Sequence, residues 1–275
     1  MLIYFALVFA ISWGGVLILA GPNGLPGTPE STARLLPFAV VAIVAGPSVA
    51  GILLTGLVHG RTGLHELRSH LFKWRVGVQW YAVALLTAPI LMTILLLALS
   101  LISPVFLPGI VTSGDKASIV LLGIFIAVMA GIFEELGWTG FAIPELRRHH
   151  SVLATGLIVG LLWAAWHLLF AFWLSGTVSG PLSLASYMLD PIFFLVPFRV
   201  LMVWVYDRTG SLLVAVLMHA SLTASARILS PLAFAGAPLL TFDLVWTAVL
   251  WVVVTAVAVA NNRQLSRQSL PRRMA

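Results

Sequence analysis

The sequence predicts an all-α polytopic membrane protein with about eight transmembrane helices. Of its 275 residues, 60% are hydrophobic and only 9% are charged, whereas a soluble domain is about 25% charged. The apolar runs are about 20 residues long, which is the length of a helix that crosses the hydrocarbon core. They lack the strict alternation of barrel strands, and the backbone in lipid must otherwise pair within each segment, as a helix does.

Eight apolar segments follow one another along the chain. The first lacks the basic start and the cleavage site of a signal peptide, so we interpret it as a span. Residues 59–78 mix Leu, Phe and Trp with basic residues, which is typical of an amphipathic segment on the inner leaflet. Internal repeats and long linkers are absent, so residues 1–275 are expected to form one domain. The predicted spans are residues 1–20, 36–58, 79–102, 118–141, 152–174, 185–206, 211–229 and 239–260.

Basic residues favour alternate loops of the predicted topology. The positive-inside rule places these loops, and with them both termini, in the cytoplasm. We therefore expect a multi-pass protein of the cell (plasma or inner) membrane, with the lipid bilayer as its partner. The net charge of +6 then reflects membrane orientation and not nucleic-acid binding, because the basic residues are scattered. They are Arg61, Arg68, Lys73, Arg75, Arg147, Arg148, Arg208, Arg263, Arg267, Arg272 and Arg273.

Two adjacent glutamates, Glu134 and Glu135, lie near the inner end of the fourth span. The chain contains only nine acidic residues. An ionised carboxylate at bilayer depth is costly, and a like charge beside it adds repulsion. The pair is therefore a candidate functional site.

Other ionisable groups lie inside the predicted spans. His167 in the fifth span and His219 in the seventh are expected at a depth similar to that of the glutamates, given the rise per residue of a helix. Asp190 precedes a proline and is expected to cap the sixth span. Arg199 is expected to be structural, either snorkelling to the inner surface or neutralising one glutamate.

The chemistry of this set has two interpretations. A carboxylate beside an imidazole is suited to act as a general base on water, and a second imidazole with a hydroxyl can donate hydrogen bonds to an oxyanion. Alternatively, His167, His219 and a glutamate could hold a divalent metal such as zinc.

The segment from His65 to His70 resembles the H-E-x-x-H motif, but its histidines are one residue too far apart to share a helix face. The chain has no Cys, which excludes thiolate chemistry.

In these residues the chain resembles the CPBP family of CAAX proteases and bacteriocin-processing enzymes, also called Abi proteins. The family carries three membrane motifs in order: E-E-x-x-x-R, F-x-x-x-H, and H-x-x-x-N or a similar polar residue. Residues 134–139, 163–167 and 219–223 match them in order and spacing, within a motif core of about residues 118–229. Thr139, Trp163 and Thr223 stand where the family has arginine, phenylalanine and asparagine.

The resemblance implies an intramembrane endopeptidase, similar to CAAX prenyl protease 2, that faces the cytoplasm and cuts a peptide or protein. Glu134 with His167 would activate the attacking water, and Glu135 would support or orient these groups. His219 with Thr223 would stabilise the oxyanion. Family members are commonly labelled metalloproteases, and a metal-free glutamate mechanism is also argued. Both alternatives stay open, with Glu134, His167 and His219 as the ligands of any metal. Arg199 is a candidate to replace the missing family arginine.

Two other classes of function compete with this hypothesis. A proton-coupled transporter can also use a glutamate pair and a histidine as a relay, although the chain lacks the matching broken helices of such carriers. A catalytically inactive membrane partner, such as an immunity protein that kept the fold, is the second. The three classes differ in whether Glu134 is needed for hydrolysis.

Overall fold

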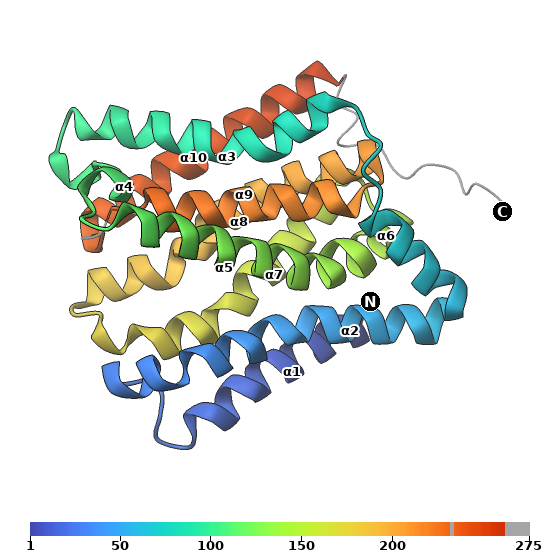
Figure 1. The fold of residues 1–275 in the computed structure, drawn as a ribbon, viewed down its shortest axis with the longest axis horizontal. Coiled ribbons are helices and arrows are strands. Elements are labelled where there is room, and N and C mark those ends of the chain that lie inside the picture. The colour runs from blue at the N-terminus through green and yellow to red at the C-terminus, as the bar shows by residue number, and fades with distance from the viewer. Residues whose placement is uncertain (232–233, 262–275) are drawn as a thin grey trace.

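The computed structural model describes residues 1–231 and 234–261, and these residues form helices without any strand. Among them, eight helices are long and apolar enough to cross a membrane. They run side by side along the long axis of the molecule (Figure 1). The predicted fold class, an all-α polytopic membrane protein, is confirmed.

Each predicted span overlaps one long helix. The long helices are α1 (Leu2–Ala20), α2 (Pro29–Leu71), α3 (Val78–Ser100), α5 (Lys116–Gly137), α7 (Val152–Leu174), α8 (Pro181–Thr209), α9 (Leu212–Leu229) and α10 (Gly236–Ala260). The short elements are η1 (Pro104–Phe106), α4 (Gly109–Thr112), the π-helical turn η2 (Trp138–Ala142), α6 (Ile143–Arg147) and η3 (Ser175–Thr177).

Polar caps set the first residues of the helices that carry the candidate site. The side chains of Asp115, Ser151 and Ser211 each accept a hydrogen bond from the backbone N–H three residues on, at the starts of α5, α7 and α9. Each such cap stabilises a helix by about 0.5–2 kcal/mol. The caps therefore help to define the register of the glutamates and histidines along their helices.

Helix α2 begins earlier than predicted and continues further. Thr28 caps it and Pro29 occupies its first turn, where a proline costs no hydrogen bond. At Gly60 the backbone has φ 63°, a left-handed conformation that suits glycine. The chain turns there and the helix resumes to Leu71, so the predicted amphipathic segment is largely helical.

The second part of α2 packs on the protein as well as facing outward. Leu67 forms a small buried cluster with Leu212 and Val216, at the start of α9. A Cβ built on Gly140 of the π-helical turn would lie 2.6 Å from Leu67 Cδ1. This amphipathic segment therefore covers the end of the bundle at which α5 ends and α9 begins.

The predicted capping role of Asp190 is wrong. Helix α8 begins at Pro181, with Gly180 as its N-cap residue at φ 86°, so Asp190 lies well inside the helix. The left-handed glycine turns the chain, and a proline at the first helical position starts α8 upstream of the predicted residue 185. Pro191 and Pro197 lie within the helix.

Small residues allow α5 and α9 to approach closely. A Cβ added to Gly131 of α5 would lie 2.8 Å from the backbone oxygen of Val216, and one added to Gly123 would lie 2.9 Å from Ile228. Close backbone approach through small residues is a common way for helices to associate in membranes. Because Glu134 and Glu135 follow Gly131 by one turn, this contact brings them beside α9.

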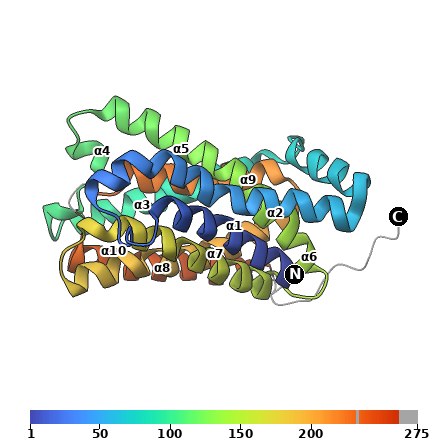
Figure 2. The same ribbon diagram turned by 90° about the horizontal axis from the view of Figure 1, so that it is seen from below.

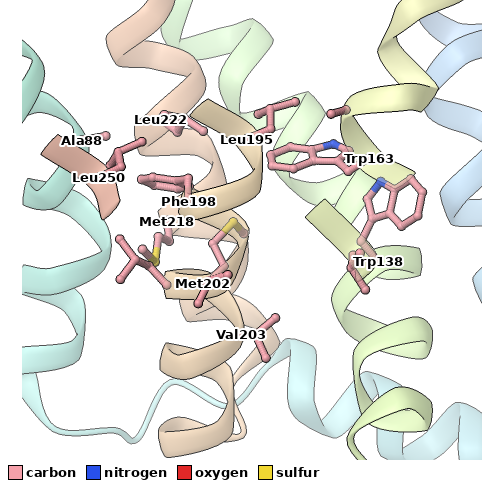
Figure 3. Close-up of a cluster of buried hydrophobic side chains, with 14 of the residues drawn as sticks. Ala88, Trp138, Trp163, Leu195, Phe198, Met202, Val203, Met218, Leu222 and Leu250 are labelled. Carbon is pink, nitrogen blue, oxygen red and sulfur yellow. The ribbon is translucent and has the colours of Figure 1, made fainter. Parts of the chain in front are cut away.

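Large apolar side chains fill the centre of the bundle. Phe198 and Met202 of α8 and Met218 of α9 are wholly buried. Figure 3 shows these side chains close together, with Trp138 and Trp163 to one side of them. Trp163 also contacts the polar groups described below.

At one end of the bundle lie the N-terminus, the turn of α2 after Gly60, and α6 (Figures 1 and 2). The predicted cytoplasmic residues Arg61, Arg147 and Arg148 belong to these segments. The basic residues of the predicted C-terminal tail, Arg263, Arg267, Arg272 and Arg273, lie outside the described residues.

Candidate active site

Glu134 and Glu135 occupy the last turn of α5 and are both buried. Adjacent residues on a helix point about 100° apart, so the two carboxylates meet different partners. Glu134 accepts a hydrogen bond from the indole nitrogen of Trp163 on α7, at 2.7 Å to Oε2. Its other oxygen, Oε1, lies 4.0 Å from Nε2 of His219. Oε1 receives no hydrogen bond from any residue that the structure describes.

Both oxygens of Glu135, in contrast, have hydrogen-bonding partners. Nη1 of Arg199 lies 3.0 Å and 2.8 Å from its two oxygens. Nδ1 of His219 lies 2.7 Å from Oε1, and the hydroxyl of Thr139 donates to Oε2. A buried charge is tolerated when it is paired and hydrogen-bonded in this way. Glu135 therefore acts as a fixed acceptor that joins three helical elements.

Arg199 of α8 is wholly buried, so the predicted alternative of snorkelling to the surface is wrong. The other predicted alternative, neutralisation of a glutamate, is confirmed by the ion pair with Glu135. The guanidinium also stacks on Trp163, with Cζ 3.8 Å from the ring centroid, which is a favourable cation–π arrangement. Arg199 and Thr139 together contact the carboxylate of Glu135.

The contact with Glu135 determines which ring nitrogen of His219, on α9, carries the proton. A carboxylate only accepts hydrogen bonds, so Nδ1 of His219 must carry the proton that it shares with Glu135. This orients the opposite ring nitrogen, Nε2, towards Glu134. The ring packs on Trp163, with centroids 5.1 Å apart, and only 2% of the residue is exposed.

His167 on α7 is oriented by its own helix. Its Nδ1 lies 2.8 Å from the backbone oxygen of Trp163, one turn earlier. A carbonyl oxygen only accepts, so Nδ1 donates, and Nε2 of the neutral ring keeps a free lone pair. The ring is partly exposed and contacts Trp163 and Trp166, with centroids 5.8 Å and 4.7 Å away. Trp163 thus lies against both histidines.

Thr223 lies one turn beyond His219 on α9 and is partly exposed. Its hydroxyl makes no hydrogen bond to another residue within the described ranges. Direct contacts therefore join Glu134, Glu135 and His219. His167 joins them through Trp163, while Thr223 only shares the helix face of His219.

Tyr4 of α1 is a neighbour of this site that no motif in the sequence indicated. A Cβ built on Gly137 would lie 2.6 Å from the hydroxyl of Tyr4 and 2.1 Å from the backbone oxygen of Pro47. Only glycine fits at this position, one turn after Glu134. Tyr4 is wholly buried, and its hydroxyl has no hydrogen-bond partner among the described side chains and backbone groups. The periodic burial of Tyr4, Val8 and Ser12 marks this face of α1, but no spacing in the sequence connects it to α5.

The predicted metal ligands were tested against the arrangement of donors. Zinc at a catalytic site takes three protein ligands. Within the described ranges, no three His, Asp or Glu side chains lie close enough together to hold a metal ion. Nε2 of His219 lies 4.0 Å from Oε1 of Glu134, and His167 meets these two residues only through Trp163. The predicted ligands are therefore not gathered into a three-residue metal site in this arrangement, and we derive the chemistry from the side chains alone.

Known proteins resemble this chain in the segment that contains these residues. A family model described as type II CAAX prenyl endopeptidase Rce1-like matches residues 116–225, the segment from α5 into α9 that carries all five candidate residues. The resemblance to the CPBP family is confirmed. A curated relative, CAAX prenyl protease 2 of Methanococcus maripaludis, is 25% identical over 145 residues. The alignment covers 51% of this chain and 50% of that relative, so it spans about half the length of the curated protein. The segment matched by the family model therefore includes the glutamates and the histidines.

Proposed function

We propose that this protein is an intramembrane endopeptidase in which Glu134 activates a water molecule. The observation that carries the proposal is the asymmetry between two adjacent carboxylates. Glu135 is neutralised by Arg199 and bound by His219 and Thr139. Glu134 has one oxygen held by Trp163 and one oxygen without a donor, close to His219. A carboxylate that is held in place but makes no contact with a guanidinium is suited to act as a general base.

The first step consists of attack by water on the carbonyl carbon of the scissile peptide bond. Before the attack, Oε1 of Glu134 accepts a hydrogen bond from one O–H group of the water, and the free Nε2 of His167 accepts a hydrogen bond from the other. As the new C–O bond forms, the proton passes to Glu134. The C–N bond then breaks as Glu134 returns that proton to the leaving nitrogen. The products are an amine and a carboxylic acid, which then loses its remaining proton to the solvent, and the carboxylate of Glu134 is regenerated.

His219 and Thr223 supply the hydrogen bonds that stabilise the tetrahedral intermediate. In this role His219 carries a second proton on Nε2, while Nδ1–H remains bound to Glu135. The buried charges then balance, because two carboxylates face one guanidinium and one imidazolium. Donors fixed before the reaction, in a site shielded from bulk water, are the most effective in stabilising an oxyanion. Thr223 lies one turn from His219 on α9, and its hydroxyl donates a further hydrogen bond to the intermediate.

The substrate proposed for the first assay is a prenylated peptide with a CAAX-type C-terminus. The name of the matched family model supports this choice, as does the name of the curated relative. The test is hydrolysis of such a peptide by the purified, reconstituted protein, with mass spectrometry to locate the cleaved bond. The Glu134→Gln variant serves as the comparison. Cleavage by both proteins, or by neither, would contradict the proposal.

We also propose that the site opens to the cytoplasm and that both termini lie there. The basic residues of α2 after Gly60 and those of α6 lie at the same end of the bundle, which supports this orientation. The chain has no cysteine, so single cysteines can be labelled without background. Ser69→Cys, on the exposed face of α2, is expected to react with a membrane-impermeant maleimide only after cell lysis. Ser179→Cys, exposed at the opposite end, is expected to react in intact cells. The reverse pattern would overturn the orientation.

A further inference from the structure

The helical segment that follows Gly60 has two faces, and the proposed hydrolysis uses neither of them. After the turn at Gly60 the chain runs across one end of the bundle, between the spans α2 and α3 (Figure 1). The inner face of this segment lines a cavity against α6 and η2, with Gly63, Glu66, Leu67 and His70. The opposite face therefore points away from the protein.

The outer face of the segment combines basic and apolar side chains. Arg61, Leu64 and Arg68 recur at intervals of three and four residues, so they share one side of the helix. All three are exposed. Glu66 is the only acidic residue between positions 61 and 75, and it belongs to the inner face. The outer face is therefore basic, without a carboxylate of its own segment to balance it.

The loop that follows this helical segment extends the surface. Phe72 and Trp74 are 67% and 63% exposed. The hydroxyls of Ser211 and Tyr81 each donate a hydrogen bond to the loop backbone, at 2.6 Å to the oxygens of Lys73 and Trp74 respectively. The backbone of the loop is thus held by the starts of α9 and α3, while its two aromatic side chains stay outside the protein.

The cations of this surface have no acidic partner within the described ranges. Cζ of Arg75 lies 5.0 Å from the ring centroid of Trp74, a cation–π arrangement that holds a guanidinium beside an exposed indole. The ion pairs of the described residues involve other cations. The basic side chains that are available to a ligand are Arg61, Arg68, Lys73 and Arg75.

The position of the surface identifies its partner. The segment joins two membrane spans, so it lies where the hydrocarbon core meets water. Exposed aromatic side chains are typical of this boundary, and basic side chains there attract anionic headgroups. We propose that residues 61–75 form a binding surface for anionic phospholipids, in which the basic side chains contact the headgroups and Phe72 and Trp74 insert beside the acyl chains. This surface is independent of the proposed proteolysis.

Quenching of Trp74 fluorescence by brominated lipids tests this surface. The protein is reconstituted in phosphatidylcholine vesicles that contain brominated phosphatidylglycerol or, in a second series, brominated phosphatidylcholine. The chain has ten tryptophans, so the signal of Trp74 is taken as the difference between wild type and Trp74→Phe. Brominated phosphatidylglycerol is expected to quench Trp74 at the lower mole fraction. Equal quenching by both lipids would overturn the proposal, as would quenching by neither, since the face would then meet water or another macromolecule.

Arg68→Gln/Arg75→Gln removes two charges from the surface and keeps its aromatic side chains. Each basic residue near an anionic surface strengthens binding by about fivefold, so the double variant is expected to lose about 25-fold of the preference for phosphatidylglycerol. Lys73 is kept, because a Cβ built on Gly210 would lie 3.1 Å from its Nζ and its removal would also change a contact within the protein. The Tm in pure phosphatidylcholine should not change, since both arginines are exposed.

Arg34→Gln/Lys116→Gln is the matched control. It makes the same change in charge at exposed positions near the starts of α2 and α5, which lie at the other end of the bundle (Figure 1). This variant should keep the preference, and an equal loss in both double variants would show that only net charge matters. Salt at about 1 M screens charges beyond about 3 Å and should remove most of the wild-type preference. An undiminished preference in that salt would contradict binding through the headgroups.

Discussion

Glu134→Gln is expected to lower kcat/KM for peptide hydrolysis by about 10²–10⁴-fold, the range associated with loss of a general acid–base group. The amide oxygen of glutamine can still accept the hydrogen bond from Trp163, but the amide cannot take a proton from water. The Tm of the variant is expected to match that of the wild type, because the buried ion pair at Glu135 is untouched. Activity and Tm are measured on the same reconstituted samples.

Glu30→Gln is the matched control for this prediction, since Glu30 is exposed in the first turn of α2. It makes the same chemical change outside the site and should leave hydrolysis unchanged. Activity of Glu134→Gln within a few-fold of wild type would remove Glu134 from the mechanism. An inactive but destabilised Glu134→Gln variant would show that the residue is structural.

Arg199→Met is expected to have the largest effect on stability, a loss of about 3–5 kcal/mol, because it leaves a buried carboxylate without its cation. Arg199 is wholly buried and contacts both oxygens of Glu135. Methionine keeps much of the apolar volume against Trp163 but supplies no hydrogen bond. The unfolding free energy of the variant, in the same lipid or detergent as the wild type, checks the expectation.

The double variant Glu135→Gln/Arg199→Met separates the ion pair from simple packing. Removing both charges should recover part of the stability lost in Arg199→Met, because no unpaired charge remains. Arg199→Lys should fall between wild type and Arg199→Met, since lysine keeps the charge but not the planar stacking on Trp163. Additive losses in the double variant would show that Arg199 and Glu135 do not stabilise each other.

The spans were predictable because a long apolar run is a local property of the sequence. The start of α2 was not, because a cap at Thr28 and a proline in the first turn outweigh the polar residues that follow them. Asp243 could have been singled out from the sequence, since it is an acidic residue inside the predicted span 239–260. It was missed, and Asp190, which lies inside α8, was predicted to be a cap.

The candidate site was predictable from scarcity, because Glu134, His167 and His219 are among the few ionisable groups at similar depth. The rotation of each helix about its axis was not predictable, since it depends on contacts between helices. The sequence therefore left two roles open for Arg199, and only the packing of α8 against α7 and α9 turns its side chain towards Glu135. The position of Tyr4 beside the site was not predictable for the same reason.

The most direct test of Glu134 as a base is a single turnover in water that carries a heavy oxygen isotope. Direct attack by water places the isotope in the new carboxylate of the product and leaves the side chain of Glu134 unlabelled. Mass spectrometry of the product and of the peptide that contains Glu134 is expected to give this result. Heavy oxygen in Glu134 itself would contradict the account, because it would require a covalent intermediate on that carboxylate.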